Sequence, residues 1–234
     1  MKRRPTCLIT GAAGGIGVAI AKQLSNLKCD LILVSKRKAK LENLVKTLKK
    51  NFEINITSFN CDFSNLDNVK KLIAALQQHR VDVLINNAAV FNVEDFTIEK
   101  HPKMLETLNV NLLAPIMLSR AIIKKMKKYR KGRLIFIGST AAYKGEKNVV
   151  TYCASKHGLL GLSKSINDEF NRYNIQSTII SPGLVKTDIH EKYRAGQNFD
   201  TFIEPKDFAE FVISLIEEKP SAFIPEVMVR RRFA

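Results

Sequence analysis

Two tyrosines in the chain stand four residues before a lysine, and such a pair can do acid–base chemistry. Tyr152 precedes Lys156 in the stretch TYCASK, and Tyr143 precedes Lys147 in AAYKGEK. A phenol with its ordinary pKa of about 10 exchanges protons poorly near neutral pH, but a neighbouring ammonium group stabilises the phenolate and lowers that pKa. The chain has 26 lysines among 234 residues. Chance therefore also explains the spacing, which does not identify a site by itself.

The two pairs differ in the segments that carry them. Gly145 interrupts the segment of the first pair, where no helical period supports a shared face. After Tyr152, apolar residues recur at helical spacing and predict a helix over Val150–Tyr173. Residues four apart lie on the same face of a helix, so we expect Lys156 beside Tyr152 and a lowered tyrosine pKa.

A glycine-rich turn near the start of the chain has the form of a phosphate-binding loop. The stretch TGAAGGIG, from Thr10 to Gly17, follows a predicted strand and leads into a predicted helix. Its glycines permit a tight turn and the close approach of a pyrophosphate, and the helix N-terminus adds amide donors. Tight turns also need glycine for steric reasons alone. In this context, however, the loop indicates dinucleotide binding.

The end of the second predicted strand indicates which dinucleotide is preferred. An acidic residue at this place would bind the adenosine ribose hydroxyls and select NAD. The chain instead has Ser35, Lys36 and Arg37, and the two cations can neutralise the 2′-phosphate of NADP. The alternative is that they are two more surface cations of a basic chain.

Short apolar runs alternate along the chain with amphipathic segments. The runs predict strands at Thr6–Thr10, Asp30–Ser35, Ile54–Asn60, Val81–Asn86, Arg133–Gly138, Ile175–Ser181 and, as a last short strand, Glu226–Arg230. The segments between them predict helices at Ile16–Lys28, Lys38–Lys50, Leu66–Arg80, Pro102–Lys128, Val150–Tyr173 and Pro205–Lys219. We expect Gly132 to close the basic helix before it and Pro205 to open the last one. This order predicts an α/β fold: one domain, residues 1–234, with a doubly wound parallel sheet of about seven strands and helices on both faces.

Composition narrows the class of protein. With 45% hydrophobic and 26% charged residues, the chain reads as a soluble globular protein. No stretch approaches 18 uninterrupted apolar residues and the apolar run after the basic N-terminus is too short for a signal peptide, so a cytoplasmic protein without a membrane span is expected. The cysteines form no CxxC pair and no cluster with histidine, which predicts buried thiols and no metal site: Cys7, Cys29, Cys61 and Cys153.

The positive charge is concentrated in one stretch. The net charge is +16, and eight basic residues lie between Arg120 and Arg133, in a region without acidic residues from Glu106 to Glu146. Such a run attracts polyanions or an acidic partner. A solvated helix face, or a general bias towards lysine, explains it equally well.

The ordered set of short motifs resembles the short-chain dehydrogenase/reductase family. The matching stretches are TGAAGGIG, NCD at 60–62, NNAA at 86–89, VN at 110–111, Ser139, YCASK at 152–156 and PGLVKT at 182–187, which keep the family's order over about residues 5–190. Each motif is weak alone, and the set is specific. The chain has Ala89 where the family's NNAG has glycine and Ala114 at a position that is often glycine; both stay small. The resemblance implies a Rossmann-type fold and NADP(H) as cofactor, with NAD(H) as the alternative.

The resemblance also implies a role for each matching residue. Ser139 would bind the substrate carbonyl, Tyr152 would donate the proton, Lys156 would lower the tyrosine pKa and hold the nicotinamide ribose, and Asn111 would hold a water of the proton relay. Asn86 and the residues after it would lie beneath the cofactor ribose. Cofactor contacts would come from Thr10, Gly11, Gly15, Ile16, Gly17, Ser35, Lys36, Arg37, Asp62, Phe63, Asn87, Ala88, Tyr152, Lys156, Pro182, Gly183, Val185 and Thr187.

These residues imply an enzyme that reduces a carbonyl or oxidises an alcohol of a small-molecule substrate. The variable segment 188–204 is expected to select that substrate without naming it. One alternative is a 3-oxoacyl-carrier-protein reductase whose basic run Lys124–Arg133 receives an acidic carrier protein. Another is a protein that senses NADPH and binds nucleic acid or an anionic membrane through its basic face, which the filled catalytic positions disfavour.

Three further expectations concern assembly and two single residues. Family members commonly pair through the two long helices, here Pro102–Lys128 and Val150–Tyr173, so a homodimer or homotetramer is implied. We expect Cys153 to be a packing residue although it adjoins Tyr152. We expect His190 to be an ordinary loop residue.

Overall fold

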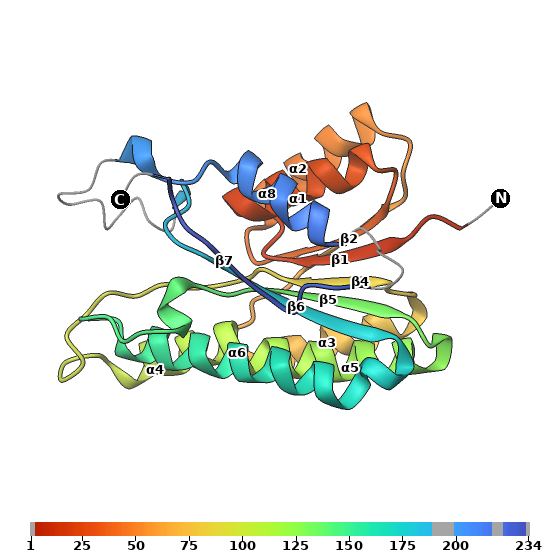
Figure 1. Ribbon diagram of the computed structural model, residues 1–234. Coiled ribbons are helices and arrows are strands. Elements are labelled where there is room, and N and C mark those ends of the chain that lie inside the picture. Colours follow the sequence, from red (N-terminus) through yellow and green to blue (C-terminus); the bar gives the residue numbers. More distant parts are fainter. Residues whose placement is uncertain (1–2, 189–198, 217–221, 233–234) are drawn as a thin grey trace.

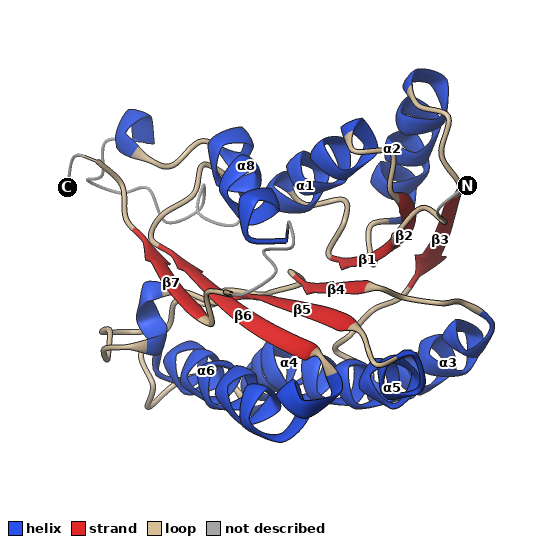
Figure 2. Ribbon diagram, turned by 45° about the vertical axis from the view of Figure 1, so that its right-hand side comes forward, coloured by secondary structure: helices blue, strands red, loops and turns tan. Residues whose placement is uncertain are grey.

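A seven-stranded parallel sheet forms the centre of the computed structural model (Figures 1 and 2), which describes residues 3–188, 199–216 and 222–232. The strand order is β3-β2-β1-β4-β5-β6-β7 and every neighbouring pair is parallel. The strands are β1 Thr6–Thr10, β2 Asp30–Ser35, β3 Ile56–Asn60, β4 Val83–Asn86, β5 Gly132–Ile137, β6 Ile175–Pro182 and β7 Glu226–Val229. The predicted α/β fold is confirmed, with β1 and β2 at their predicted bounds.

Helices cover both faces of the sheet (Figure 1). One face carries α1 Gly15–Asn26, α2 Lys38–Asn51 and α8 Pro205–Ile216. The other carries α3 Leu66–Ala75, α4 His101–Leu108, α5 Ala114–Tyr129 and α6 Val150–Phe170. Pro205 opens the last helix as predicted. The chain reverses its direction of winding between β1 and β4, and such a switch point leaves a crevice at the carboxyl ends of the strands.

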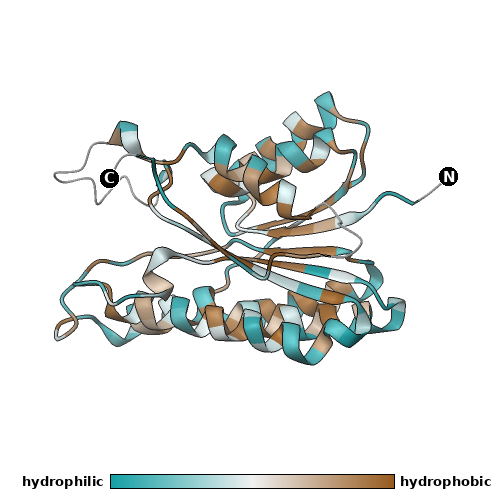
Figure 3. Ribbon diagram, in the orientation of Figure 1, coloured by the Kyte–Doolittle hydropathy of each residue, from teal (hydrophilic) through white to brown (hydrophobic). Residues whose placement is uncertain are grey.

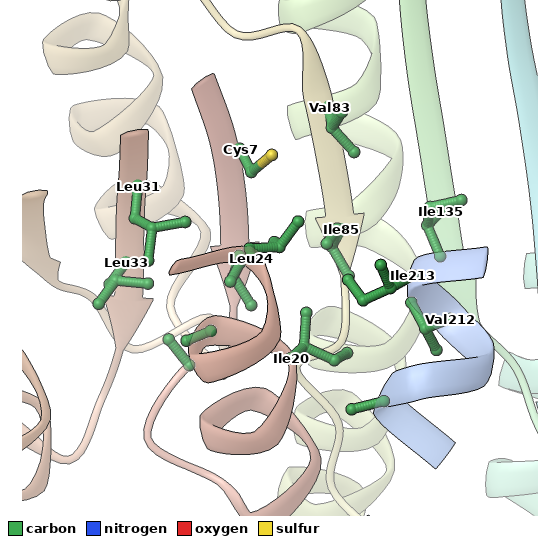
Figure 4. Close-up of a cluster of buried hydrophobic side chains, with 14 of the residues drawn as sticks. Cys7, Ile20, Leu24, Leu31, Leu33, Val83, Ile85, Ile135, Val212 and Ile213 are labelled. Atoms are coloured by element: carbon green, nitrogen blue, oxygen red, sulfur yellow. The ribbon is translucent and has the colours of Figure 1, made fainter. Parts of the chain in front are cut away.

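Alternating side chains of the strands build two hydrophobic cores. Figure 3 shows that the strands carry many hydrophobic residues. In β1, Cys7 and Ile9 enter the core under α1 and α8, whereas Leu8 enters the core on the opposite face. Figure 4 shows Cys7 of β1 together with Ile20 and Leu24 of α1 in the first of these cores. All four cysteines are free and buried, as predicted. Within the described residues, no helix is long and apolar enough to cross a membrane, and no group of side chains could hold a metal ion.

The predicted continuous helix Pro102–Lys128 is wrong, because a π-helical turn, Asn109–Leu113, separates α4 from α5. The amide of Ala114 donates to the carbonyl of Asn109, five residues earlier. Pro115 has no N–H with which to continue an α-helical ladder, and the wider turn accommodates it. The turn places Asn111 inside the protein.

The expected role of Gly132 at the end of the basic helix is also wrong. Helix α5 ends at Tyr129, and Arg130 takes the left-handed conformation with φ 47°. Gly132 is the first residue of β5, where a Cβ atom would collide with the Met126 side chain. Glycine is required there by close packing and not by a helix cap.

Candidate active site

The loop between β1 and α1 passes very close to the segment after β4. Gly11 has φ +63°, and a Cβ atom there would lie 2.8 Å from Ala88 Cα. A Cβ atom on Gly17 would lie 2.8 Å from Ala12 Cα and would also collide with the carbonyl of Gly11. The first glycine is required by both conformation and space, and the second by space alone. The loop therefore leaves room above it for a ligand that approaches the backbone.

Thr10 and Asn86 lie at the ends of β1 and β4, next to this loop. The buried Thr10 hydroxyl accepts hydrogen bonds from the amides of Asn87 and Ala88, both at 3.0 Å. The buried Asn86 donates to the hydroxyl of Ser119 at 3.4 Å. Neither Thr10 nor Asn86 lines a described cavity, although the sequence placed both at the cofactor. They position the segments that do.

A cavity of about 420 Å³, here the first cavity, opens at the carboxyl ends of the central strands. It lies at the switch point where open α/β sheets bind ligands. Apart from Thr10, Asn86 and Asn111, every predicted site residue lines it: Gly11, Gly15, Ile16, Gly17, Ser35, Lys36, Arg37, Asp62, Phe63, Asn87, Ala88, Ser139, Tyr152, Lys156, Pro182, Gly183, Val185 and Thr187. The structure thus brings motifs from the whole chain to one surface.

Cations gather at the β2 end of the first cavity. The Lys36 ammonium lies 3.5 Å from Glu106, and Arg37 lies 3.1 Å from Asp188. Lys40, which the sequence reasoning missed, lies 3.3 Å from the same Asp188 carboxylate. Lys40 follows Arg37 by three residues at the start of a helix, and residues at this spacing lie on the same helix face, so the sequence could have predicted its position. Lys40 and Arg37 together hold the pKa of Asp188 below its usual range.

The phenol of Tyr152 lies where the first cavity meets the segment after β5. Its ring packs edge-on against Phe91, with 4.7 Å between the centroids. Burial raises the pKa of Tyr152 to about 12, and a hydrogen bond with Ser139 opposes that rise. The lowered pKa expected from Lys156 is therefore wrong for this structure. The sequence pattern carries the lysine's charge but not the cost of burying a phenolate.

Lys156 is buried, with 2% of its surface exposed, and it lies beside Tyr152 as the helical spacing predicts. The ammonium donates a hydrogen bond to the Ile137 carbonyl at 2.9 Å and lies 5.7 Å from the centre of the Tyr152 ring. Burial lowers the pKa of Lys156 to about 8. A lysine in this state exchanges its proton near neutral pH, which an exposed lysine does not.

Asn111 acts as a clamp in this structure. Its carboxamide oxygen accepts from the Val90 amide at 2.9 Å, and its nitrogen donates to the Val90 carbonyl at 2.9 Å and to Ser155 at 3.2 Å. Ser155 in turn donates to the Tyr152 carbonyl at 2.7 Å. The predicted water contact of Asn111 stays a prediction. The serine inside YCASK, which sequence reasoning passed over, joins this clamp to the helix of Tyr152.

The second tyrosine–lysine pair is not assembled in the same way. Tyr143 follows a short 3₁₀ turn and lies with its hydroxyl 3.4 Å from Ser181, and burial raises its pKa to about 12. It lines neither described cavity. Cys153 is buried beside Ala141 and Val149, as a packing residue should be. His190 lies outside the described residues.

A second cavity of about 610 Å³ adjoins the first. Four residues line both cavities: Phe91, Ser139, Tyr152 and Gly183. The second cavity has no residue of the glycine loop; its other lining residues are Val93, Thr140, Lys144, Glu146, Lys147, Val149, Leu184, Phe202, Arg230 and Arg231. Of the variable segment 188–204, Asp188 lines the first cavity and Phe202 the second, and residues 189–198 lie outside the described part. The sequence did not indicate the two arginines, which β7 brings from the end of the chain.

Known proteins resemble the chain along most of its length. The model of the short chain dehydrogenase family matches residues 5–198. A 3-oxoacyl-[acyl-carrier-protein] reductase from Rickettsia bellii is 33% identical over 227 residues, covering 94% of this chain and 91% of the relative. A metagenomic short-chain oxidoreductase solved with NADP is 30% identical, with a TM-score of 0.84 and 98% of each chain covered. A 4-hydroxyisoleucine dehydrogenase solved with NADH is 25% identical, with a TM-score of 0.87 and 97% of each chain covered.

Proposed function

Because the chain belongs to the short-chain dehydrogenase family, we propose that it is an oxidoreductase that transfers hydride between NADPH and the carbonyl carbon of a small-molecule substrate. One observation carries the proposal. Ser139 and Tyr152 line both cavities, so a substrate in the second cavity can meet a cofactor in the first at these two residues.

The first cavity has the donors that a dinucleotide needs. Its glycine loop leaves backbone exposed to a pyrophosphate, and the N-terminus of α1 adds amide donors and a positive dipole end. Lys36 and Arg37 stand at the end of β2, where a carboxylate would favour NAD. These cations, together with the NADP complex of the metagenomic relative, support NADP(H) as the preferred cofactor. The NADH complex of the dehydrogenase supports NAD(H) as the alternative.

The side chains can perform the proton transfer that reduction requires. When bound, the nicotinamide supplies the hydride. With a pKa of about 12, Tyr152 is protonated at neutral pH and donates its proton to the carbonyl oxygen, which Ser139 orients by a hydrogen bond. Lys156, with a pKa of about 8, is a proton source close to the tyrosine ring. Carbonyl, hydride and proton together give the alcohol, and the reverse reaction returns the proton to Tyr152.

A 3-oxoacyl-carrier-protein reductase is a second candidate, supported by the name and identity of the Rickettsia relative. The basic run that was to receive the carrier lies at the end of α5 and the start of β5, whereas Ser139 follows the carboxyl end of β5. At about 3.3 Å per residue, the six residues of β5 separate the two ends by about 20 Å. No residue of this run lines either cavity, so a carrier bound there would have to reach Ser139 from the other edge of the sheet.

The basic run is also smaller than the sequence suggests. Lys125 donates to the carbonyls of Leu76 and Gln77, and Arg133 donates to the Leu215 carbonyl, so both are tied into the fold. A homodimer or homotetramer built on α4, α5 and α6 stays our proposal for the assembly. The large apolar side chains exposed on these segments support it: Leu105, Leu113 and Val150.

The decisive experiment compares the two tyrosines. NADPH oxidation is followed with a panel of ketones, aldehydes and acyl thioesters for the wild type, Tyr152→Phe and Tyr143→Phe. We expect Tyr152→Phe to lower kcat by about 1,000-fold, since it removes the proton donor, and to leave NADPH binding intact. Tyr143→Phe removes a phenol of similar pKa outside the cavities and should turn over like the wild type. Equal turnover in Tyr152→Phe would overturn the proposal.

A further inference from the structure

The second cavity carries an excess of positive charge. Its lining includes Lys144, Lys147, Arg230 and Arg231 but only one carboxylate, Glu146, which lies 3.3 Å from Lys144. Three cations are thus left without a counter-charge in the lining. Such a field attracts anions to the cavity and repels cationic substrates.

The two arginines reach the cavity through the last strand. β7 pairs in parallel with β6, Val229 opposite Pro182, and the Gly183 amide donates to the Val229 carbonyl at 2.8 Å. Arg230 and Arg231 follow directly, beside a glycine that lines both cavities. The sheet therefore fixes the position of the two arginines, which line the same cavity as Ser139 and Tyr152.

Arg231 is held in place before any ligand binds. Its guanidinium donates to the Thr201 hydroxyl at 3.1 Å and lies 5.6 Å from the centre of the Phe202 ring, a buried side chain. A guanidinium fixed in this way binds carboxylate or phosphate with two parallel hydrogen bonds and loses little entropy.

The rest of the lining offers apolar surface beside these charges. Apart from the charged residues, Thr140, Gly183 and the two catalytic hydroxyls, it is apolar: Phe91, Val93, Val149, Leu184 and Phe202. A hydrocarbon segment of a substrate can pack against these apolar side chains. Resting on the proposed function, we propose that the substrate is a carbonyl compound with an anionic terminus, a carboxylate or a phosphate, which the cations of the second cavity bind.

The test uses three substrates with one carbon skeleton: an oxo acid, its methyl ester and the corresponding oxo phosphate. We expect the KM of one or both anions to be at least about ten-fold below that of the ester. That KM should rise with ionic strength, whereas the KM of the ester should not. The ratio of acid to phosphate identifies which anion the cavity takes.

Variants show which residues of the second cavity bind the anion. Replacing both cavity arginines (Arg230→Gln with Arg231→Gln) should raise the KM of the anion about ten-fold and leave the ester unchanged. The matched control is Arg232→Gln, which alters the next arginine of the same tail, outside the cavity lining. The arginine double variant also removes the contact with Thr201 and could therefore disturb the fold there. A second double variant, Lys144→Gln with Lys147→Gln, leaves that contact intact and should also raise the KM of the anion.

The outcomes separate this inference from the proposed function. If acid, phosphate and ester have equal, salt-independent KM values in a wild type that depends on Tyr152, the anionic substrate is refuted and the reductase stands. If no carbonyl compound is reduced, the reductase proposal fails. Calorimetric titration with glutarate then decides the anion site, since only the cavity arginines, not Arg232, should reduce its affinity. Equal affinity in both variants refutes the site.

Discussion

The two cavities share Ser139 and Tyr152 but are built in different ways. Backbone shapes the first: glycines of the β1–α1 loop, strand ends, and the turn after β6. Side chains shape the second, and they come from segments far apart in the chain, from Phe91 to Arg231. In the first, Arg37 and Lys36 lie against carboxylates, whereas most cations of the second face no carboxylate in the lining.

This difference between the cavities corresponds to the difference between cofactor binding, which a family shares, and substrate selectivity, which varies among its members. A backbone cradle needs glycine and small residues at fixed places, so its sequence is recognisable and its ligand is the common one. A cavity made of side chains changes with each substitution and carries the selectivity for the substrate. Short sequence motifs therefore indicate the cofactor, whereas the substrate can be inferred only from the folded structure.

The largest loss of stability should come from adding a side chain to a glycine of the β1–α1 loop, which shapes the first cavity. Gly17→Ala places a methyl group 2.8 Å from Ala12 Cα and against the Gly11 carbonyl, where backbone must shift. We expect a loss of about 3 kcal/mol in the free energy of unfolding, as for overpacked cores, together with weaker NADPH binding. Urea unfolding and NADPH titration measure the two.

Gly161→Ala is the matched control for that change. Gly161 also lies in a helix, α6, but a Cβ atom added to it would meet nothing within 4 Å, so alanine there should add up to about 1 kcal/mol through helix propensity. If both variants had the same stability and the same NADPH affinity, the first cavity would not depend on its backbone.

Local sequence was sufficient for the strands, for most of the helices and for most of the residues that line the first cavity. The strands and the Tyr152 helix follow from apolar periodicity, and strand ends of a parallel sheet must meet at one edge. The hydrogen bonds of Thr10 and Asn111 could not be predicted, because their partners lie 77 and 21 residues away in the chain. Pro115 did carry a signal for the π turn, since proline interrupts a helical ladder.

The environment of a side chain was the property that sequence could not supply. Lys156 next to Tyr152 suggested a lowered phenol pKa, but burial acts on both groups and opposes the charged form of each. The anionic preference of the second cavity was equally hidden, because β7 brings Arg230 and Arg231 to Lys144 and Lys147 only in the folded chain.

Stability against pH should distinguish the buried cation of the first cavity from the exposed ones of the second. Burial lowers the pKa of Lys156 from 10.5 to about 8, so between these values the unfolded chain binds the proton and the folded chain does not. The contribution of Lys156 to stability is therefore fully present above 10.5 and is lost as the pH falls through about 8.

The experiment compares the wild type with Lys156→Met by urea unfolding. From pH 7.5 to 9.5 the free energy of unfolding of the wild type should rise relative to the variant by about 2 kcal/mol. Lys147→Met, at an exposed lysine of the second cavity, should follow the wild type. A constant difference between wild type and Lys156→Met over this range contradicts the buried, uncharged lysine.

The smallest effect concerns the ion pairs of Asp188, which we expect to weaken the binding of NADPH by Arg37. The Asp188 carboxylate lies 3.1 Å from Arg37 and 3.3 Å from Lys40, and it lines the first cavity. A 2′-phosphate bound by Arg37 must compete with this carboxylate and is repelled by it. Exposed ion pairs contribute at most about 1 kcal/mol, so Asp188→Asn should tighten NADPH binding about three- to five-fold and leave NADH binding unchanged.

Fluorescence titration of the two cofactors measures that ratio, and salt provides a second reading. Since the variant gains its advantage through charge, the gain for NADPH should shrink at high ionic strength. Glu204→Gln is the control, because Glu204 pairs with Lys186 at 3.0 Å and lines neither cavity. An equal gain for NADH in Asp188→Asn would mean that the carboxylate opposes the dinucleotide as a whole. The cations at the end of β2 would then not be what distinguishes the two cofactors.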